Sequence, residues 1–450
     1  MKIDKKILAR VEQEMDKYHG RFEKYFPRSE PREQSRKYLQ GLLSAQDRRN
    51  GWELAETVGD SVPDRTQRLL YRSSWDLNGV LDEHIQFAAE QVGTPHGTFV
   101  IDETGFLKSG KSSAGVQRQY TGTAGKITNC QIGVFLGYAS GQGSMLLDRR
   151  LYMPKVWCED VKKREKVQVP KELTFATKPR QALEMLRHAV SDLGFPGRWV
   201  VGDEVYGGSV FRAEVAKLEL KYVLAVSCTD TVKKVPGEFS GRPLFSFWPE
   251  ETSMSVDRIA RNIPDRCWHS LVTKAGERAP IRYLWAAIRV MIATAEEGWL
   301  LIRRSLSDRD EMAFYFSNAP AETSVKTLAR IALQRAEIEK CFSEAKTEAG
   351  MDEYEVRLWP AWYRHITLSM MAHAFLSATK KKLSTTQSCA SVSLVRDAVR
   401  LVLQSRAGIE SASFFMVWLK FKVKRRLLAM KCRYQGRYYR VVPRDVRQSY

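Results

Sequence analysis

The order of apolar and amphipathic segments in the middle of the chain restricts the possible folds more than any other feature. Five segments there are apolar or alternate between apolar and polar residues, and these properties predict β-strands. Two further segments have the helical spacing of apolar residues. In chain order the expected elements are strands at 98–102, 131–138 and 144–152, a helix at 179–193, a strand at 198–203, a helix at 210–218 and a strand at 222–226. This order predicts an α/β fold.

Two of these strands end in a carboxylate, because Asp102 and Asp203 each follow a run of apolar residues. The carboxyl edge of an α/β sheet is where such proteins bind ligands, although a single charge at a strand end usually marks only the approach to solvent. Glu103 and Glu204 compete for the same roles. Since neighbouring residues of a strand point to opposite faces, we expect only one member of each pair to enter a site.

A helix expected from about residue 324 to residue 350 carries a base, an acid, an aromatic ring and a second base on one side. These residues, Arg335, Glu339, Phe342 and Lys346, fall within roughly 60° of one another on a helix that turns about 100° per residue. Taken alone, the pattern is more typical of a surface helix with ordinary ion pairs.

Together, Asp102, Asp203 and Glu339 form a set of three carboxylates able to hold two Mg²⁺ ions roughly 4 Å apart. One ion would activate water or a 3′-hydroxyl, and the other would stabilise the leaving oxygen. Arg335 and Lys346 would hold the phosphates of a strand beside this set. The combination predicts metal-dependent cleavage of phosphodiesters.

The net charge points to an acidic polymer as partner. Lys and Arg outnumber Asp and Glu by 72 to 52, which gives a formal charge of +20. Heparin-like polymers and anionic membrane surfaces would also attract a chain with this net positive charge. The start of the chain has no apolar signal segment, and no apolar run is long enough to span a bilayer. We therefore expect a cytoplasmic protein that does not bind a membrane. The seven cysteines contain no CxxC pair, which argues against a zinc site.

Both ends of the chain carry cations in patterns that suit nucleic acid. Near the N-terminus, residues 52–59 and 63–72 predict two short helices around a glycine turn, and the second bears Arg65 and Arg68. A helix-turn-helix and a plain helical bundle with solvated arginines both fit this pattern. At the other end, the cations from Lys420 to Arg447 alternate with tyrosines, which fits a tail that tracks phosphates or one that is only solvated.

A phosphate-loop pattern offers a different function. Gly105–Ser112 fits GxxxxGK[ST], which in a P-loop NTPase cradles phosphates where a helix begins at the Lys-Ser pair. Gly115, Gly122 and Gly125 follow soon afterwards and disfavour a helix there. This alternative predicts ATP hydrolysis that depends on Lys111.

Three segments resemble, in order, the motifs of bacterial insertion-sequence transposases of the DDE superfamily. The run 101–131 resembles the first-aspartate segment, and Gly202–Gly207 resembles the second. Arg335-x3-Glu339-x6-Lys346 is similar to the Tyr-x2-Arg-x3-Glu-x6-Lys signature of one large branch, with Ala332 in place of the tyrosine. The resemblance covers roughly residues 95 to 375.

The resemblance implies cut-and-paste transposition in a bacterial, nucleoid-associated setting. Cleavage and strand transfer at terminal inverted repeats would use Mg²⁺, for which Mn²⁺ can substitute, within a homodimeric synaptic complex on double-stranded DNA. Lys108, Lys111 and Arg118 become candidate strand-binding residues. Trp285 or Trp299 would contact a flipped base, or would pack in the core. A transposase-derived DNA-binding protein without catalysis is the remaining alternative, since Ala332 departs from the signature.

The implied organisation is an RNase H-like catalytic core interrupted by a β-rich insertion. The expected parts are a helical DNA-binding domain at 1–92, the first part of the core at 93–232, the insertion at 233–318, the catalytic helix and the helix after it at 319–380, and a helical, basic region at 381–450.

Overall fold

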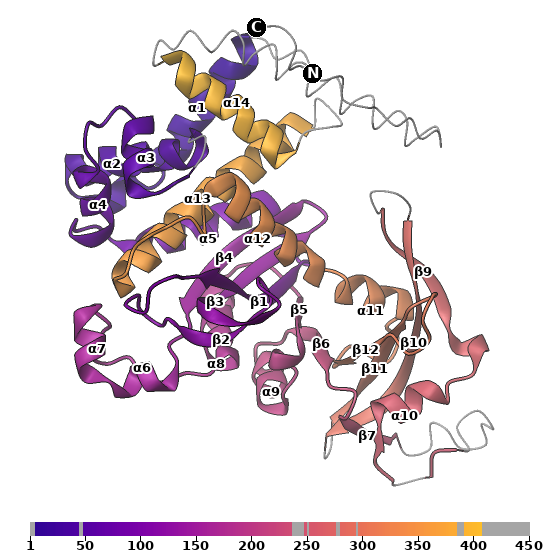
Figure 1. The fold of residues 1–450 in the computed structure, drawn as a ribbon. Coiled ribbons are helices and arrows are strands. Elements are labelled where there is room, and N and C mark those ends of the chain that lie inside the picture. The colour runs from indigo at the N-terminus through magenta and orange to yellow at the C-terminus, as the bar shows by residue number, and fades with distance from the viewer. Residues whose placement is uncertain are drawn as a thin grey trace, which may run out of the picture.

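The structure, a computed structural model, describes residues 5–44, 48–235, 247–249, 252–275, 280–293, 296–384 and 391–406. The cationic end of the chain from Lys420 to Arg447 lies outside these ranges, so its contact with a phosphate backbone stays a prediction. Figure 1 shows a central sheet, a layer of helices drawn from both ends of the chain above it, and a second group of strands to its right.

Five strands form the centre of the molecule and confirm the expected α/β fold. Three antiparallel neighbours come first, and two strands parallel to the first of them follow on its other side. They are β1 (Thr98–Leu107), β3 (Lys126–Ser140), β4 (Gly143–Leu151), β5 (Trp199–Gly202) and β6 (Lys221–Val226). The sheet order β4-β3-β1-β5-β6, with helices on both faces, is consistent with the RNase H-like core that the resemblance implies.

One strand was missed, and several short helices complete the core. β2 (Gln117–Thr121) pairs with the first half of β3, where its polar residues give no apolar alternation to recognise. The two helices expected after β4 and β5 are present as α8 (Lys178–Arg187), which continues into the π-helical turn His188–Asp192, and α9 (Ser209–Lys217). The remaining short elements are α6 (Lys155–Glu159), α7 (Val161–Lys166) and the 3₁₀ helix η3 (Glu204–Tyr206).

The insertion is rich in strands, as expected, but it continues the core sheet and does not form a sheet of its own. β12 pairs with β6 through Phe314, Tyr315 and Phe316, and β11 and β10 follow in order. Its elements are β7 (Thr231–Lys234), β8 (Met254–Ser255), α10 (Val256–Arg261), β9 (His269–Ala275), β10 (Pro280–Ala293), β11 (Glu296–Arg304) and β12 (Met312–Ser317). Backbone hydrogen bonds therefore couple the insertion directly to the strand after β5.

Helices from the two ends of the chain pack together in one layer. The long helix α13 contacts β4, on which α5 also lies, and it contacts α2, α4, α12 and α14 (Figure 1). The helices are α1 (Lys5–Gly20), α2 (Ser29–Ser44), α3 (Gly51–Thr57), α4 (Asp64–Tyr71), α5 (Leu77–Val92), α13 (Trp359–Ser384) and α14 (Val392–Arg406). His365 and His373 of α13 are buried and hydrogen-bonded. Within the described residues, no helix is long and apolar enough to cross a membrane.

The single helix expected from residue 324 to residue 350 is instead two helices, α11 (Val325–Ala332) and α12 (Arg335–Ala349). The expected ends are correct: the Ser324 side chain caps α11, and Gly350 ends α12 in the left-handed conformation with φ +62°. The break at residues 333–334 contains no Gly or Pro. Its reason lies in packing, because α11 lies across the core strands β5 and β6 and the insertion strands β9 to β11, whereas α12 lies against β1, β3 and β4.

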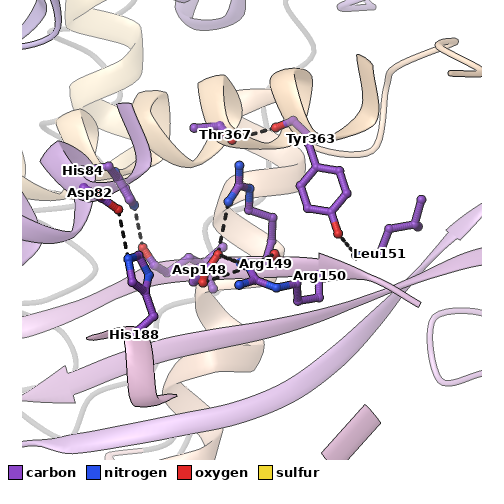
Figure 2. A network of polar contacts seen from close by, with 10 residues as sticks. Asp82, His84, Asp148, Arg149, Arg150, Leu151, His188, Tyr363 and Thr367 are labelled. Atoms are coloured by element: carbon purple, nitrogen blue, oxygen red, sulfur yellow. Dashed lines mark hydrogen bonds and ion pairs between the residues drawn. The ribbon is translucent and has the colours of Figure 1, made fainter. Parts of the chain in front are cut away.

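A buried charge cluster fixes the edge strand β4 beneath the helical layer. The Asp148 carboxylate is fully buried and accepts hydrogen bonds from Arg149 Nη1 at 3.1 Å and from Arg150 Nη1 at 2.9 Å. Figure 2 shows Asp148 between the two guanidinium groups, with Tyr363 of α13 reaching the backbone of Leu151. One buried carboxylate therefore faces two guanidinium groups, of which Arg149 is buried and Arg150 is partly exposed, so the cluster keeps a net positive charge.

Replacing Asp148 with Ala should lower the free energy of unfolding by about 3–5 kcal/mol, because Arg149 would stay buried without its counter-charge. Urea denaturation of the full chain measures the effect. The control is Glu159→Ala, which removes an exposed pair with Lys155 and should cost less than about 1 kcal/mol. Equal losses in the two variants would contradict this account of the cluster.

Candidate functional site

The parallel pairing of β1 with β5 places Asp102 and Asp203 side by side. Asp203 follows the end of β5 as expected, but the expectation that Asp102 ends its strand was wrong, because β1 continues to Leu107 through its pairing with β3. Ile101 pairs with Gly202, so the next residue of each strand, Asp102 and Asp203, emerges at the same edge of the sheet. Backbone N–H groups orient both carboxylates: Glu103 donates to Asp102 Oδ1 at 2.8 Å, and Val205 donates to Asp203 Oδ1 at 3.0 Å. Two carboxylates from separate strands therefore share one small region.

The rival carboxylates point elsewhere, as strand alternation predicts. Glu103 lies on the other face of β1, where it pairs with Lys178 of α8 and accepts a hydrogen bond from the Tyr206 hydroxyl at 3.3 Å. Glu204 is exposed at the start of η3. Asp102 and Asp203 thus have different surroundings from both neighbours.

Helix α12 faces these aspartates with the side that was expected to carry Arg335, Glu339, Phe342 and Lys346, and we call this row of residues the stripe. Arg335 Nη2 lies 3.3 Å from Asp102 Oδ2 and 3.7 Å from Glu339 Oε1. Phe342 packs against Phe135 of β3, with 5.2 Å between ring centroids. The other three glutamates of the helix point away, toward β4, α13 and α14, where they meet Ser144, His373 and Arg396.

Lys346, the last residue of the stripe, donates to Thr104 Oγ1 at 2.9 Å and to the Gly105 carbonyl at 3.2 Å. Its ammonium is therefore tied to the strand that carries Asp102. Thr104 was not predicted from the sequence as the partner of Lys346. The signal was present, because Thr104 follows Asp102 by two residues and so shares its face of the strand.

Burial makes the aspartates costly to ionise. It raises the pKa of Asp102 to about 6, and the opposing positive charge of Arg335 only partly offsets this effect. Burial also raises the pKa of Asp203, again against the influence of Arg335. Both carboxylates therefore gain from any further positive charge placed beside them.

Glu339 lies on the same side of the sheet but farther out. Its side chain is 61% exposed, and Arg335 lies between it and Asp102. In the part of the chain that the structure describes, no three His, Cys, Asp or Glu residues are close enough to form a metal site. The structure thus brings together Asp102, Asp203 and Arg335. The Arg335 side chain separates Glu339 from Asp102.

The predicted strand-binding cations divide into two kinds. Lys108 is engaged inside the protein, because its ammonium donates to the Tyr354 carbonyl at 2.9 Å and lies 3.4 Å from the centroid of the Tyr354 ring. Burial lowers the pKa of Lys108 to about 8. By contrast, Lys111 and Arg118 are exposed near β2, and Arg65 and Arg68 are exposed on α4.

The nucleotide-binding alternative is wrong on geometry. Gly105 to Leu107 belong to strand β1, and the chain after Lys111 and Ser112 enters β2 without forming a helix. A phosphate loop needs a helix amino-terminus at the Lys-Ser pair to supply its N–H groups. The match to GxxxxGK[ST] is therefore coincidental.

Two further positions behave as packing residues. Ala332 is buried at the end of α11, so the place of the signature tyrosine lies on a different helix from Arg335. Trp285 is fully buried and stacks on Tyr315, and Trp299 donates to the Pro320 carbonyl at 3.1 Å. These contacts favour core packing over a flipped base for both tryptophans.

Comparison with known proteins gives two findings. The chain matches the family described as DDE superfamily endonuclease over residues 21–261, a region that includes Asp102 and Asp203 and ends before α12. It is also similar to a probable transposase for insertion sequence element IS701 from Microchaete diplosiphon, with 28% identity over 204 residues. That alignment covers 44% of this chain and 50% of the relative, so the chain matches about half the length of this protein.

Replacing Asp102 with Asn should stabilise the folded protein at pH 7 in the presence of EDTA. The pKa of Asp102 is raised from 3.8 to about 6, so ionised Asp102 opposes folding above pH 6, and the cost disappears below about pH 4, where the residue is protonated in both states. We expect a gain of about 1–3 kcal/mol at pH 7.

Urea denaturation at pH 4 and pH 7 measures this difference. The control is Glu204→Gln, an exposed neighbour of Asp203, which should change stability by less than about 0.5 kcal/mol at either pH. A gain that is the same at both pH values would show that ionisation of Asp102 is not its cause.

Proposed function

The chain belongs to the DDE superfamily endonuclease family, and from this premise we propose that it is the transposase of an insertion sequence. It cleaves DNA at terminal inverted repeats and transfers the ends to a target by a cut-and-paste route. The observation that carries this proposal is the pairing of β1 with β5, which sets Asp102 beside Asp203 opposite Arg335 and Glu339 of α12.

We assign Asp102, Asp203 and Glu339 as the ligands of two Mg²⁺ ions, for which Mn²⁺ can substitute. The chemistry of the two aspartates fits, because Mg²⁺ prefers carboxylate oxygens and both groups are stabilised in their ionised form by added positive charge, while Glu339 lies farther out, beyond Arg335. When bound, the ions supply activation of the attacking oxygen and stabilisation of the leaving oxygen.

The chain's own residues position the DNA strand around these carboxylates. Arg335 has a partly exposed guanidinium beside Asp102 and can form paired hydrogen bonds to a phosphate. Lys346, tied to Thr104 and Gly105, keeps a positive charge along the same side of the helix. Lys108 contributes by fixing the end of β1 against Tyr354.

Exposed cations elsewhere extend the contact to double-stranded DNA. We propose that α4 enters a groove as the second helix of a helix-turn-helix, with Arg65 and Arg68 facing the DNA. The buried residues Leu69 and Leu70 hold a neighbouring side of α4 in the helical layer. Two copies of the chain in a synaptic complex, acting in the bacterial nucleoid, complete the proposal.

Replacing Asp102, Asp203 or Glu339 individually with Ala should reduce Mg²⁺-dependent cleavage of candidate inverted-repeat DNA by at least about 100-fold, because each change removes a metal ligand. Binding to the same DNA in EDTA should stay within about threefold of the parent. The control is Glu204→Ala, an exposed carboxylate beside Asp203, which should retain cleavage. Cleavage retained by a ligand variant would overturn the assignment, and binding without cleavage by the parent protein would indicate a non-catalytic relative.

Replacing both Arg65 and Arg68 with Gln should weaken DNA binding and lower the slope of log Kd against log salt by about 2, since each phosphate contact contributes close to one unit. Fluorescence anisotropy at several salt concentrations measures the slope. The matched control is Lys217→Gln on α9, which also removes an exposed cation. An unchanged slope in the double variant would exclude α4 from the interface.

A further inference from the structure

The hairpin formed by β2 and β3 presents two large apolar side chains to solvent. Tyr120 and Ile127 pair across the two strands, and their exposed fractions are 65% and 61%. Directly opposite residues of an antiparallel pair share a face, so the two side chains form one continuous surface. A single exposed apolar residue is common, whereas an exposed cross-strand pair of large apolar side chains needs a reason.

The other face of the hairpin is anchored in the protein and fixes the orientation of this pair. Thr121 and Cys130 are buried, and the Gln119 side chain donates to the Cys130 carbonyl at 3.1 Å. These residues alternate with Tyr120 along their strands and therefore point away from it. Rotation of the ribbon to bury Tyr120 would break these contacts.

Cations flank the apolar pair and no acid lies near it in sequence. Arg118 lies two residues before Tyr120 on the same face and is exposed. Asn129, opposite Arg118, donates to the carbonyls of Lys108 at 2.6 Å and Gly110 at 2.8 Å, and so holds the loop with exposed Lys111 against the hairpin. From residue 104 to residue 147 the sequence contains no Asp or Glu. We call Lys111, Arg118, Tyr120 and Ile127 the hairpin patch.

The turn of the hairpin is joined to the proposed active site. The Thr123 hydroxyl lies 3.2 Å from both the backbone N and the carbonyl of Gly105, three residues after Asp102. Lys346 Nζ lies 3.5 Å from the same hydroxyl. The hairpin that carries the patch therefore begins beside Lys346, the last residue of the stripe on α12. A DNA strand that reaches Asp102 can continue onto the hairpin patch.

We propose that the hairpin patch binds the unpaired end of the DNA substrate, with one base packed against Tyr120 and Ile127 and the flanking phosphates on Lys111 and Arg118. An aromatic side chain flanked by cations is the combination that binds single-stranded nucleic acid, because stacking and phosphate pairing act together. Apolar side chains also separate base steps where proteins distort duplex ends. The inference rests on the proposed function only in taking DNA as the substrate.

The test is binding of the full chain, in EDTA, to two 20-base-pair duplexes of one arbitrary sequence. One duplex is fully paired, and the other has three unpaired nucleotides at one end, with 2-aminopurine as the last base. Tyr120→Ala combined with Ile127→Ala should weaken binding of the unpaired end by about tenfold and abolish the fluorescence change of 2-aminopurine. Binding of the paired duplex should change by less than about threefold.

Two controls separate stacking from general loss of structure. Tyr120→Phe keeps the ring and should bind within about twofold of the parent, and Val210→Ala removes an apolar side chain that is 76% exposed on α9 and should have no effect. The melting temperature of the double variant should match that of the parent, since both side chains are exposed.

Other outcomes would overturn the inference. If the double variant binds the unpaired end as tightly as the parent does, the hairpin patch does not bind DNA. Tyr120-dependent binding to phosphatidylserine vesicles without DNA discrimination would assign the patch to a membrane, and Tyr120-dependent dimerisation without DNA would assign it to a second copy of the chain. Because no cleavage is measured, failure of the proposed enzyme activity stays distinguishable from failure of the hairpin patch.

Discussion

The parallel pairing of β1 with β5 is the constraint on which the rest of the site depends. It forces Asp102 and Asp203 to emerge together, although two carboxylates in a partly buried region repel each other and lose hydration. Arg335 offsets part of this cost from α12, so the helix is held over the sheet by the same charges that we propose are used in catalysis. Stability and chemistry are therefore opposed at this edge, as is common where carboxylates are gathered for catalysis.

The position of Arg335 is set by two packing surfaces. α11 lies across the junction of the core with the insertion, on β5, β6 and β9 to β11, and α12 lies on β1, β3 and β4. The chain breaks between the two helices directly before Arg335. Because β12 continues the core sheet beside β6, the insertion is attached to the core by backbone hydrogen bonds as well as by this helix pair. A shift of the insertion would consequently move α11 and the start of α12 together.

Positive charge serves two different purposes in this molecule, and net charge alone does not separate them. Arg149 and Lys108 are used internally, against Asp148 and Tyr354, and contribute to the integrity of the fold. Lys111 and Arg118 project from the surface beside the exposed apolar pair and are available to a polyanion. The difference arises from burial, which forces a cation to find a partner within the protein.

Local patterns in the sequence determined the order of strands, the carboxylate that follows β5 and the capped ends of the Ser324–Gly350 segment, because hydrophobic period and capping chemistry act over a few residues. Motif order likewise indicated the family. The continuation of β1 beyond Asp102 was not recognised, since it depends on pairing with β3. Only the tertiary structure decided the break before Arg335, the formation of β2 from polar residues, the burial of Lys108 and the outward position of Glu339. Each of these depends on partners distant in sequence, whose packing no local period records.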